Sequence, residues 1–369
     1  MARTQSRHHA PDELVTGPGP QLSRRVALIA AITPFVVIAT DLLVAVLAGP
    51  GLRWLSMLAA APALAAARYG PRSVIAFGAV SLAIGVTLGM RPGSPSVDDQ
   101  AFVLAALAVI TVASALLSAL RQRRERELIA VRSVAEAAQQ AILAPVPERV
   151  GSLRIAVRYS AAAAEASIGG DLYGVVLTPF GPRAIMADVR GKGLPAVSTA
   201  ALVLGVFREA AHDEPDLLRV VDRVENSLRR NLGSDDFVTA VLVGFPSPDR
   251  LHIANCGHVP PLLVHRQVVT VVEPESTVPP LGLLELSEAR PALVSVAFEE
   301  GDQLLLYTDG VTEARNHQGV FFPLPERLQQ HLTADFTGTL DALHARLLDH
   351  NGGRLNDDAA LLLIQRAAP

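Results

Sequence analysis

Hydrophobic residues in the first third of the chain gather into four long runs, and polar, turn-forming segments separate them. The runs cover Val26–Ala48, Leu52–Ala67, Ser73–Met90 and Ala101–Leu120. Crossing about 30 Å of hydrocarbon takes roughly 20 apolar residues, and each run is near that length, although the second is short. The alternative is a buried soluble bundle, but four such runs with almost no charge favour membrane helices. The pattern predicts an all-α transmembrane region of four helices over residues 25–120.

Basic residues flank these runs unevenly. Arginines precede the first run, separate the second from the third and follow the fourth in RQRRERE, whereas the other two loops hold only Arg53 and Arg91. Cytoplasmic loops are enriched in Lys and Arg. We therefore expect a multi-pass cell-membrane protein in contact with membrane lipid, with a disordered cytoplasmic N-terminus (1–24) and a cytoplasmic C-terminal domain. Two roles stay open for Asp41, the acid within the first run. It either faces a ligand or a proton path, or it makes an interhelical contact.

Residues 121–143, RQRRERELIAVRSVAEAAQQAIL, contain no Gly or Pro. Leu128, Val131, Ala135, Ala138 and Ile142 recur at helical spacing, which predicts an amphipathic helix leaving the membrane. Pro145 and Pro147 would end it. Residues 121–147 are thus a linker helix. It is either an inert spacer or a regulatory element that passes on rotation or forms a homodimer.

From residue 148 to 369 the pattern changes to short alternating strands with turn signals. Strands are expected over LRIAVRY, LYGVVLTPF, RAIMADV, FVTAVLVGF, RLHIANC, PPLLVHR, QVVTVVE, ALVSVAF, DQLLLYT and AALLLIQ. Helices are expected over Leu194–Ala211, Asp216–Asn231, Leu324–Leu332 and Gly338–His350. Many antiparallel strands with helices in pairs indicate an α+β sandwich rather than an alternating βαβ array.

Composition narrows the chemistry. The net charge of −4 argues against nucleic acid as a partner. The single cysteine, Cys256, excludes an internal disulfide framework and a cysteine-based zinc site.

Five acidic residues stand at the ends of predicted strands: Asp171, Asp188, Asp309, Asp357 and Asp358. Asp beside Gly is ordinary turn chemistry, so any one of them alone would indicate a turn. Buried strands would bring their ends together, however, and clustered carboxylates repel unless cations neutralise them. Oxygen-only donors favour hard ions such as Mg²⁺ or Mn²⁺. Two such ions about 4 Å apart can create a hydroxide and clamp a phosphoryl group.

A family resemblance covers about 220 residues in the order ILAPVPERVGSLRIAVRY, IGGDLYG, ADVRGKGLPAV, DDFVTAVLVGF, NCGHVPPLLV, PPLGLLE, GDQLLLYTDGVTEARN and NDDAALLLI. In the order and spacing of these motifs, the domain resembles the bacterial PPM-type (PP2C-like) serine/threonine phosphatases of the SpoIIE and RsbU type. The resemblance implies an αββα sandwich with two Mn²⁺ or Mg²⁺ ions at one edge of the paired sheets. It also implies in-line attack of a metal-activated water on phosphoserine or phosphothreonine, without a phospho-enzyme.

The same resemblance assigns roles to residues. Asp188 would bridge both ions, with the carbonyl of Val189 beside it, and Asp171 would lie on the side of one ion. Asp309 and Asp357 would bind the other ion, with Asp358 as a neighbour, so the expected catalytic acids are Asp171, Asp188, Asp309 and Asp357.

The loop residues Gly170, Arg190, Gly191 and Lys192 are the candidates to contact the phosphate. Arg190 stands where relatives often have Ser, and it is either a phosphate contact or a solvated residue. Lys192 is by default a surface contact.

Gly174 stands where relatives often have Asp or Glu, which could loosen support behind the metal ligands. For His258, a structural turn histidine is favoured over a metal ligand.

These sequence features are compatible with three functions. The first is a membrane-tethered metal-dependent phosphatase, whose phosphoprotein substrate by analogy is a STAS-type anti-sigma-factor antagonist. The second is a membrane receptor whose phosphatase-like domain only binds a partner. The third is cyclic-dinucleotide synthesis, which Leu172 and Tyr173 disfavour because they replace the Glu-Phe that would follow GGD.

Overall fold

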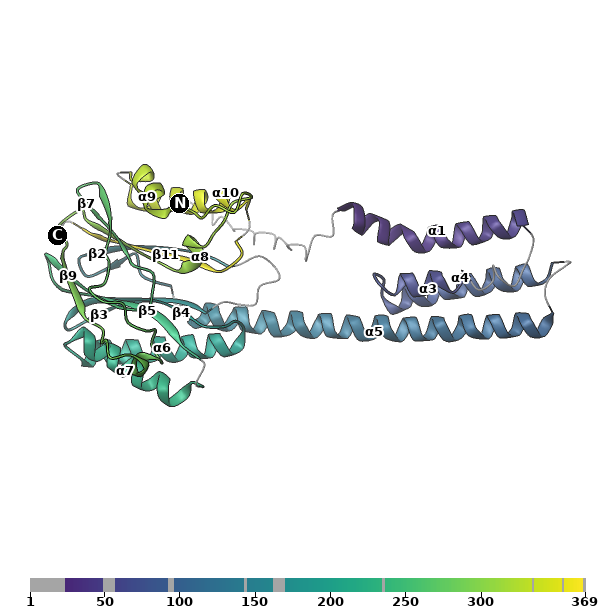
Figure 1. The fold of residues 1–369 in the computed structure, drawn as a ribbon, viewed down its shortest axis with the longest axis horizontal. Helices are drawn as coiled ribbons and strands as arrows, with labels where there is room; N and C mark the ends of the chain where they lie inside the picture. The colour runs from purple at the N-terminus through teal and green to yellow at the C-terminus, as the bar shows by residue number, and fades with distance from the viewer. Residues whose placement is uncertain are drawn as a thin grey trace, which may run out of the picture. The chain divides into compact units, whose positions relative to one another are not determined.

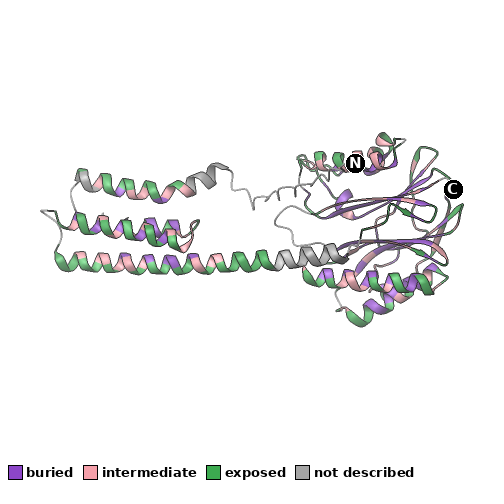
Figure 2. Cartoon of the chain, turned by 180° about the vertical axis from the view of Figure 1, so that it is seen from behind, coloured by how far each residue is buried: buried purple, intermediate pink, exposed green. Residues whose placement is uncertain are grey.

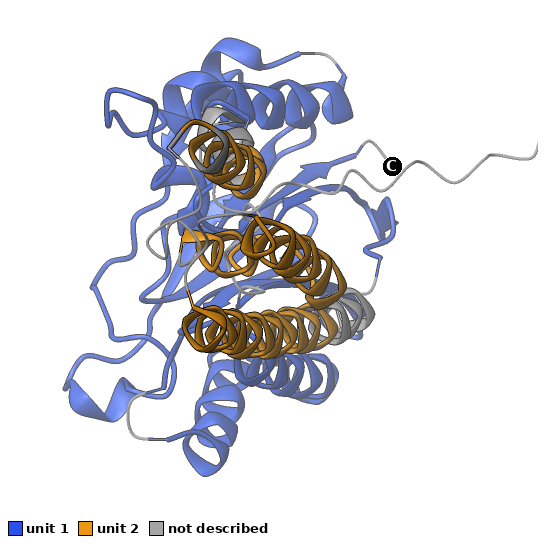
Figure 3. Ribbon diagram, turned by 90° about the vertical axis from the view of Figure 1, so that its right-hand side faces the viewer, with its two compact units in different colours: residues 1–17, 132–369 blue, residues 18–131 orange. Residues whose placement is uncertain are grey.

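The computed structural model describes residues 24–48, 57–91, 96–142, 145–161, 170–233, 236–333, 335–353 and 355–367. The chain forms two compact units whose boundary falls after Val131, within a long helix (Figure 3). The expected disordered N-terminus lies outside the described residues, apart from Arg24.

The first unit along the chain, residues 18–131, is drawn orange and labelled unit 2 in Figure 3, and it is helical. Its elements are α1 (Arg24–Ala48), α3 (Ala60–Ala65), α4 (Pro71–Gly89) and the part of α5 (Val97–Ile142) that precedes residue 132. The second apolar run differs from its prediction, because in its described part turn residues Leu58 and Ala59 separate the helical Met57 from the six-residue α3. Pro62 explains the interruption, since its ring clashes with the carbonyl four residues earlier, at Leu58.

Small side chains bring α4 and α5 close together. A Cβ on Gly78 would lie 2.1 Å from Cγ2 of Thr111, so only glycine fits there. Ser81 and Ser114 are buried on the same two helices, and the Ser118 hydroxyl donates to the carbonyl of Tyr69 (2.6 Å). Small residues and interhelical hydrogen bonds of this kind are typical of packed transmembrane helices.

Three described helices are long and apolar enough to cross a membrane: Pro71–Gly89, Val97–Ala130 and Leu194–Asp213. Ala31–Val44 is apolar but shorter. The third of these helices, α6, belongs to the second unit, where it forms one layer of a sandwich and buries Val203, Leu204 and Phe207. The apolar helices of the first unit suggest a membrane protein.

The second unit contains two antiparallel sheets (Figure 1). The six-stranded sheet has the order β1 (Arg149–Val150), β2 (Leu153–Ser160), β11 (Ala359–Arg366), β10 (Gln303–Tyr307), β7 (Leu262–His265), β8 (Val268–Val271). The five-stranded sheet has the order β3 (Asp171–Thr178), β4 (Gly181–Val189), β5 (Val238–Ser247), β6 (Arg250–Cys256), β9 (Leu293–Ala297). The expected strands all form, and β3 and β4 make a hairpin, in which Thr178 pairs with Gly181.

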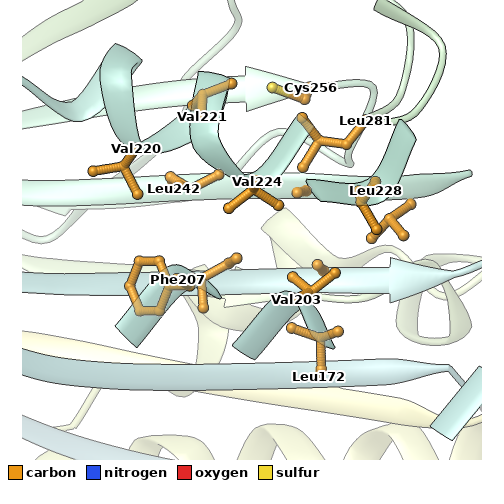
Figure 4. Packing of buried hydrophobic residues seen from close by; sticks show 14 of the residues in the cluster. Leu172, Val203, Phe207, Val220, Val221, Val224, Leu228, Leu242, Cys256 and Leu281 are labelled. Carbon is orange, nitrogen blue, oxygen red and sulfur yellow. The ribbon is translucent and has the colours of Figure 1, made fainter. Parts of the chain in front are cut away.

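Three hydrophobic clusters define four layers. One lies between the five-stranded sheet and helices α6 (Leu194–Asp213) and α7 (Leu217–Asn231), and it contains Leu172, Val203 and Phe207 (Figure 4). A second cluster, with Met186 and Leu306, fills the space between the sheets. The third packs α9 (Leu324–His331) and α10 (Phe336–His350) on the six-stranded sheet. The buried strands stand out in Figure 2. The αββα sandwich is therefore confirmed.

A buried arginine ties β4 to the end of α6. Arg183 is 3% exposed, and its guanidinium donates to the carbonyls of Ala211 (2.9 Å), Glu214 (2.6 Å) and Pro215 (2.7 Å). The last carbonyls of a helix lack partners within the helix, and a cation also suits the negative end of the helix dipole. Burial lowers the pKa of this guanidinium. Arg183 thus fixes α6 on the sheet that carries Asp171 and Asp188.

Candidate metal centre

Asp171 and Asp188 lie directly opposite each other in the β3–β4 ladder, at the edge where β3 begins and β4 ends. Asp171 is buried, and the Thr308 hydroxyl donates to its Oδ2 (2.7 Å). Gly170 precedes β3 in a space that admits no side chain, because a Cβ there would lie 2.2 Å from the carbonyl oxygen of Val189. The GGD segment therefore brings one carboxylate beside another and beside a backbone oxygen.

The facing sheet supplies the other acids. Asp309 begins the short helix α8 (Asp309–Thr312) directly after β10, and Asp357 and Asp358 immediately precede β11. Gly310 allows the two segments to approach, since a Cβ there would lie 1.9 Å from the carbonyl oxygen of Asp358. Asp358 is buried and accepts a hydrogen bond from the Tyr159 hydroxyl, whereas the Asp357 side chain is 52% exposed.

One pocket of about 280 Å³ gathers all of the residues predicted for the site. It is lined by Gly170, Asp171, Asp188, Val189, Arg190, Gly191, Lys192, Phe237, Thr239, Asp309, Asp357 and Asp358. Gly174 does not line it. That glycine is buried in β3, and a Cβ there would meet Leu204 and Phe207 of α6. The departure at Gly174 thus lies on the helix-covered face, away from the carboxylates.

The charges in this pocket are unbalanced. Burial, followed by the charges of Asp309 and Asp357, raises the pKa of Asp188 to about 7, although a hydrogen bond with Asp171 acts in the opposite direction. Burial and the charge of Asp188 raise the pKa of Asp171 well above its usual range. Burial, then Glu313 and Asp357, raises the pKa of Asp309. Carboxylates that hold protons so strongly need positive charge to ionise.

The donor set fits hard divalent ions. All candidate ligands are carboxylate or carbonyl oxygens, which Mg²⁺ and Mn²⁺ prefer. Within the described part of the chain, no three His, Cys, Asp or Glu side chains converge as a ready-made metal cluster. An ion such as Mg²⁺ tolerates this arrangement, because it usually keeps several waters and takes only one or two carboxylates from the protein.

The two basic residues of the RGKG loop make different contacts: Lys192 pairs with an acid of the pocket, and Arg190 packs on an aromatic ring. Lys192, the only lysine in the chain, places Nζ 2.8 Å from Oδ1 of Asp357, and this hydrogen bond raises the lysine pKa. Arg190 instead stacks on the Phe237 ring (5.4 Å to its centre), and its backbone N–H donates to the carbonyl of Phe237 (3.0 Å). Lys192 therefore acts as a counter-ion for a carboxylate, and Arg190 is held at the rim of the pocket.

Sequence reasoning missed Thr308 and did not single out Thr239. Thr308 is fully buried. Besides donating to Asp171, its hydroxyl accepts from the N–H of Ala360 (3.0 Å), which joins β11 to the acid on β3. Thr239 lies opposite Asp188 in the β4–β5 ladder. A hydroxyl beside an acid pair carries no local sequence signal, because its partners are far away in the chain.

An αββα sandwich with an acidic pocket at one edge of its sheets is the architecture of PP2C-like serine/threonine phosphatases. The family model of stage II sporulation protein E (SpoIIE) matches residues 181–367, half of the chain. The chain belongs to this family of PP2C-like phosphatases.

Individual relatives are more distant. The chain is 24% identical over 207 residues to the phosphoserine phosphatase RsbU of Bacillus subtilis. This alignment covers 54% of this chain and 60% of RsbU. It is 26% identical over 156 residues to the phosphoserine phosphatase RsbP of the same organism, covering 41% of this chain and 38% of RsbP. The SiaA-PP2C domain of Pseudomonas aeruginosa shares the fold, with a TM-score of 0.55 and 17% identity over 67% of this chain and 99% of that domain. This chain thus spans at most about three fifths of these curated relatives.

Proposed function

We propose that this protein is a membrane-anchored, metal-dependent phosphatase that hydrolyses phosphoserine or phosphothreonine on a signalling protein. The observation that carries the proposal is the gathering of five aspartates from two sheets around one pocket of about 280 Å³. A domain without a metal would gain nothing from this arrangement, since like charges in a partly buried site repel.

The proposed ligands divide between two Mn²⁺ or Mg²⁺ ions. Asp188 would touch both, the carbonyl of Val189 and Asp171 would serve one, and Asp309 and Asp357 would serve the other. Asp358 is already engaged by Tyr159, which suits a neighbour of a ligand better than a direct ligand. When bound, the two ions would supply a hydroxide-like water and neutralise the phosphoryl oxygens.

The protein's own groups then orient the phosphate. The mouth of the pocket offers the Lys192 ammonium, the Arg190 side chain and the backbone of Gly170 and Gly191. Lys192 holds Asp357 in the described structure. With Asp357 neutralised by an ion, the ammonium would be released to donate to a phosphate oxygen. Positively charged donors that reach a phosphoryl group stabilise the charge that spreads over its oxygens.

The proposed setting is a membrane signalling system. Residues 25–120 would cross the membrane, residues 121–147 would form a linker or regulatory helix that can also form a homodimer, and residues 148–369 would be the cytoplasmic phosphatase domain. A STAS-type anti-sigma-factor antagonist is the proposed substrate class, supported by the similarity to RsbU and RsbP. Reporter fusions placed after Leu120 should show a cytoplasmic location, and a fusion on the opposite side would overturn the orientation.

The competing function is a receptor whose phosphatase-like domain only binds a partner. The raised pKa values of Asp171 and Asp188 weigh against it, because a binding scaffold has no reason to keep unneutralised acids at this edge. Phosphate release separates the two functions. The detergent-solubilised full chain should release phosphate from a phosphoserine peptide only with Mn²⁺ or Mg²⁺. Asp188→Ala and Asp309→Ala should abolish release, and the exposed-helix control Asp222→Asn should not. Unchanged activity in both alanine variants would sink the enzyme proposal.

A further inference from the structure

His258 lies between the two sheets, directly behind the metal pocket. It follows β6, is 8% exposed, and both of its ring nitrogens are engaged. Nδ1 lies 2.9 Å from the Thr239 hydroxyl on β5. Nε2 lies 3.0 Å from the carbonyl oxygen of Tyr307 on β10. The imidazole therefore spans from a strand of the five-stranded sheet to a strand of the six-stranded sheet.

The partners define which nitrogen carries the proton. A carbonyl oxygen can only accept, so Nε2–H donates to Tyr307, and Nδ1 must accept from the Thr239 hydroxyl. Burial lowers the pKa of His258 to about 4, so the ring is neutral at physiological pH. The backbone is fixed as well. The Asn255 side chain accepts from the His258 N–H and donates to its carbonyl, both at 2.9 Å. With the backbone held in this way, the ring has one orientation that satisfies both of its own bonds.

Each end of this bridge is next to a proposed metal ligand. Thr239 lies opposite Asp188 in the β4–β5 ladder. Tyr307 is followed by Thr308, which donates to Asp171, and then by Asp309. The one side chain that joins Thr239 to Tyr307 thus connects the strand beside the proposed bridging acid to the strand end that carries a ligand of the other ion.

We propose that His258 is a positioning residue that sets the separation between the Asp188 and Asp309 halves of the two-metal site through its bonds to Thr239 and Tyr307. This inference rests on the proposed two-metal function. His258 is not itself a metal ligand, because neither nitrogen is available to an ion. Loss of the bridge leaves the buried carbonyl of Tyr307 without this donor and the partly buried Thr239 hydroxyl without this acceptor, and allows the sheet ends to shift. Groups that orient metal ligands typically change metal affinity 10- to 100-fold when mutated.

The test measures Mn²⁺ binding to the detergent-solubilised full chain by calorimetry and by electron paramagnetic resonance. His258→Ala should weaken Mn²⁺ binding by about 10- to 100-fold and replace the signal of two coupled ions with that of separate ions. His258→Gln, which can still donate to Tyr307, should recover part of the affinity. The matched control is His265→Ala on β7, which breaks a partly buried pair with Asp302 (2.9 Å) outside the pocket and should leave Mn²⁺ binding unchanged.

Thr239→Val provides the second arm if His258→Ala fails to fold. It removes one hydroxyl at nearly constant shape and should lower Mn²⁺ affinity and weaken the coupled signal. Wild-type affinity and coupling in Thr239→Val and in folded His258→Ala would overturn the inference. So would an equal loss in His265→Ala, since it would indicate a general effect on stability. Failure of the proposed function would be seen in the wild-type chain, as two bound Mn²⁺ ions without release of phosphate.

Discussion

The ammonium of Lys192 lies 2.8 Å from Oδ1 of Asp357, so the only lysine in the chain neutralises a carboxylate assigned to a metal ion. A cation at this position competes with a divalent ion and is also within reach of a phosphate that enters the pocket. The ammonium is therefore expected to weaken metal binding and to speed catalysis.

Lys192→Gln separates the two effects. Without the ammonium, Mn²⁺ should bind a few-fold more tightly, because a repelling charge is removed. Phosphate release should nevertheless slow by roughly 100-fold, the loss seen when one preorganised donor is removed. Calorimetry and peptide hydrolysis check the two parts, with Arg219→Gln on the exposed face of α7 as the control. Weaker Mn²⁺ binding in Lys192→Gln would contradict the assignment of Lys192 as a competing counter-ion.

Metal affinity should depend on pH through Asp188. The pKa of this acid is about 7 without a metal, so below that pH a bound Mn²⁺ ion must displace its proton. Affinity should rise with pH, by about tenfold per unit for each displaced proton. Calorimetry at about pH 5.5 and at about pH 8, in two buffers with different heats of ionisation at each pH, measures the number of protons released on binding. Asp188→Asn should release fewer protons. Identical proton release in the variant would show that another group titrates.

Gly310 should be intolerant of any side chain. Gly310→Ala would place a Cβ 1.9 Å from the backbone oxygen of Asp358 and push β11 away from α8. We expect Mn²⁺ affinity to fall about 10- to 100-fold. Gly205→Ala is the matched control, because nothing lies within 4 Å of a Cβ at that helical position. It should keep full affinity and add up to about 1 kcal/mol of stability. Normal Mn²⁺ binding by Gly310→Ala would show that the two segments need not touch.

Arg183 should matter for stability and not for metal binding. Arg183→Met leaves the carbonyls of Ala211, Glu214 and Pro215 without their donor, which should cost about 1–3 kcal/mol. Hydrogen exchange should become faster at the end of α6, and the urea midpoint should fall. Arg219→Met, on the exposed face of α7, should change stability by less than about 0.5 kcal/mol. Slow exchange at the α6 end in Arg183→Met would contradict the proposed cap.

Local patterns predicted the strands and the acidic strand ends because these depend on alternation and on residues close in sequence. Apolar composition predicted one helix over the second apolar run, which a turn interrupts before Pro62. Composition also does not separate membrane helices from buried ones, since α6 is apolar enough to cross a membrane yet forms a layer of the sandwich. Contacts between the sheets could not be predicted, since the bonds of Thr308 to Asp171 and of His258 to Tyr307 join residues 137 and 49 positions apart.

The position of manganese in crystals of the full chain tests the central claim most directly. Anomalous scattering should show two Mn²⁺ peaks about 3.5–4 Å apart, the spacing of two-metal hydrolytic sites. Asp188 should lie between them, with Asp171 and the carbonyl of Val189 on one side and Asp309 and Asp357 on the other. Crystals with a single peak, or with Mn²⁺ bound away from Asp188, would contradict the two-metal account.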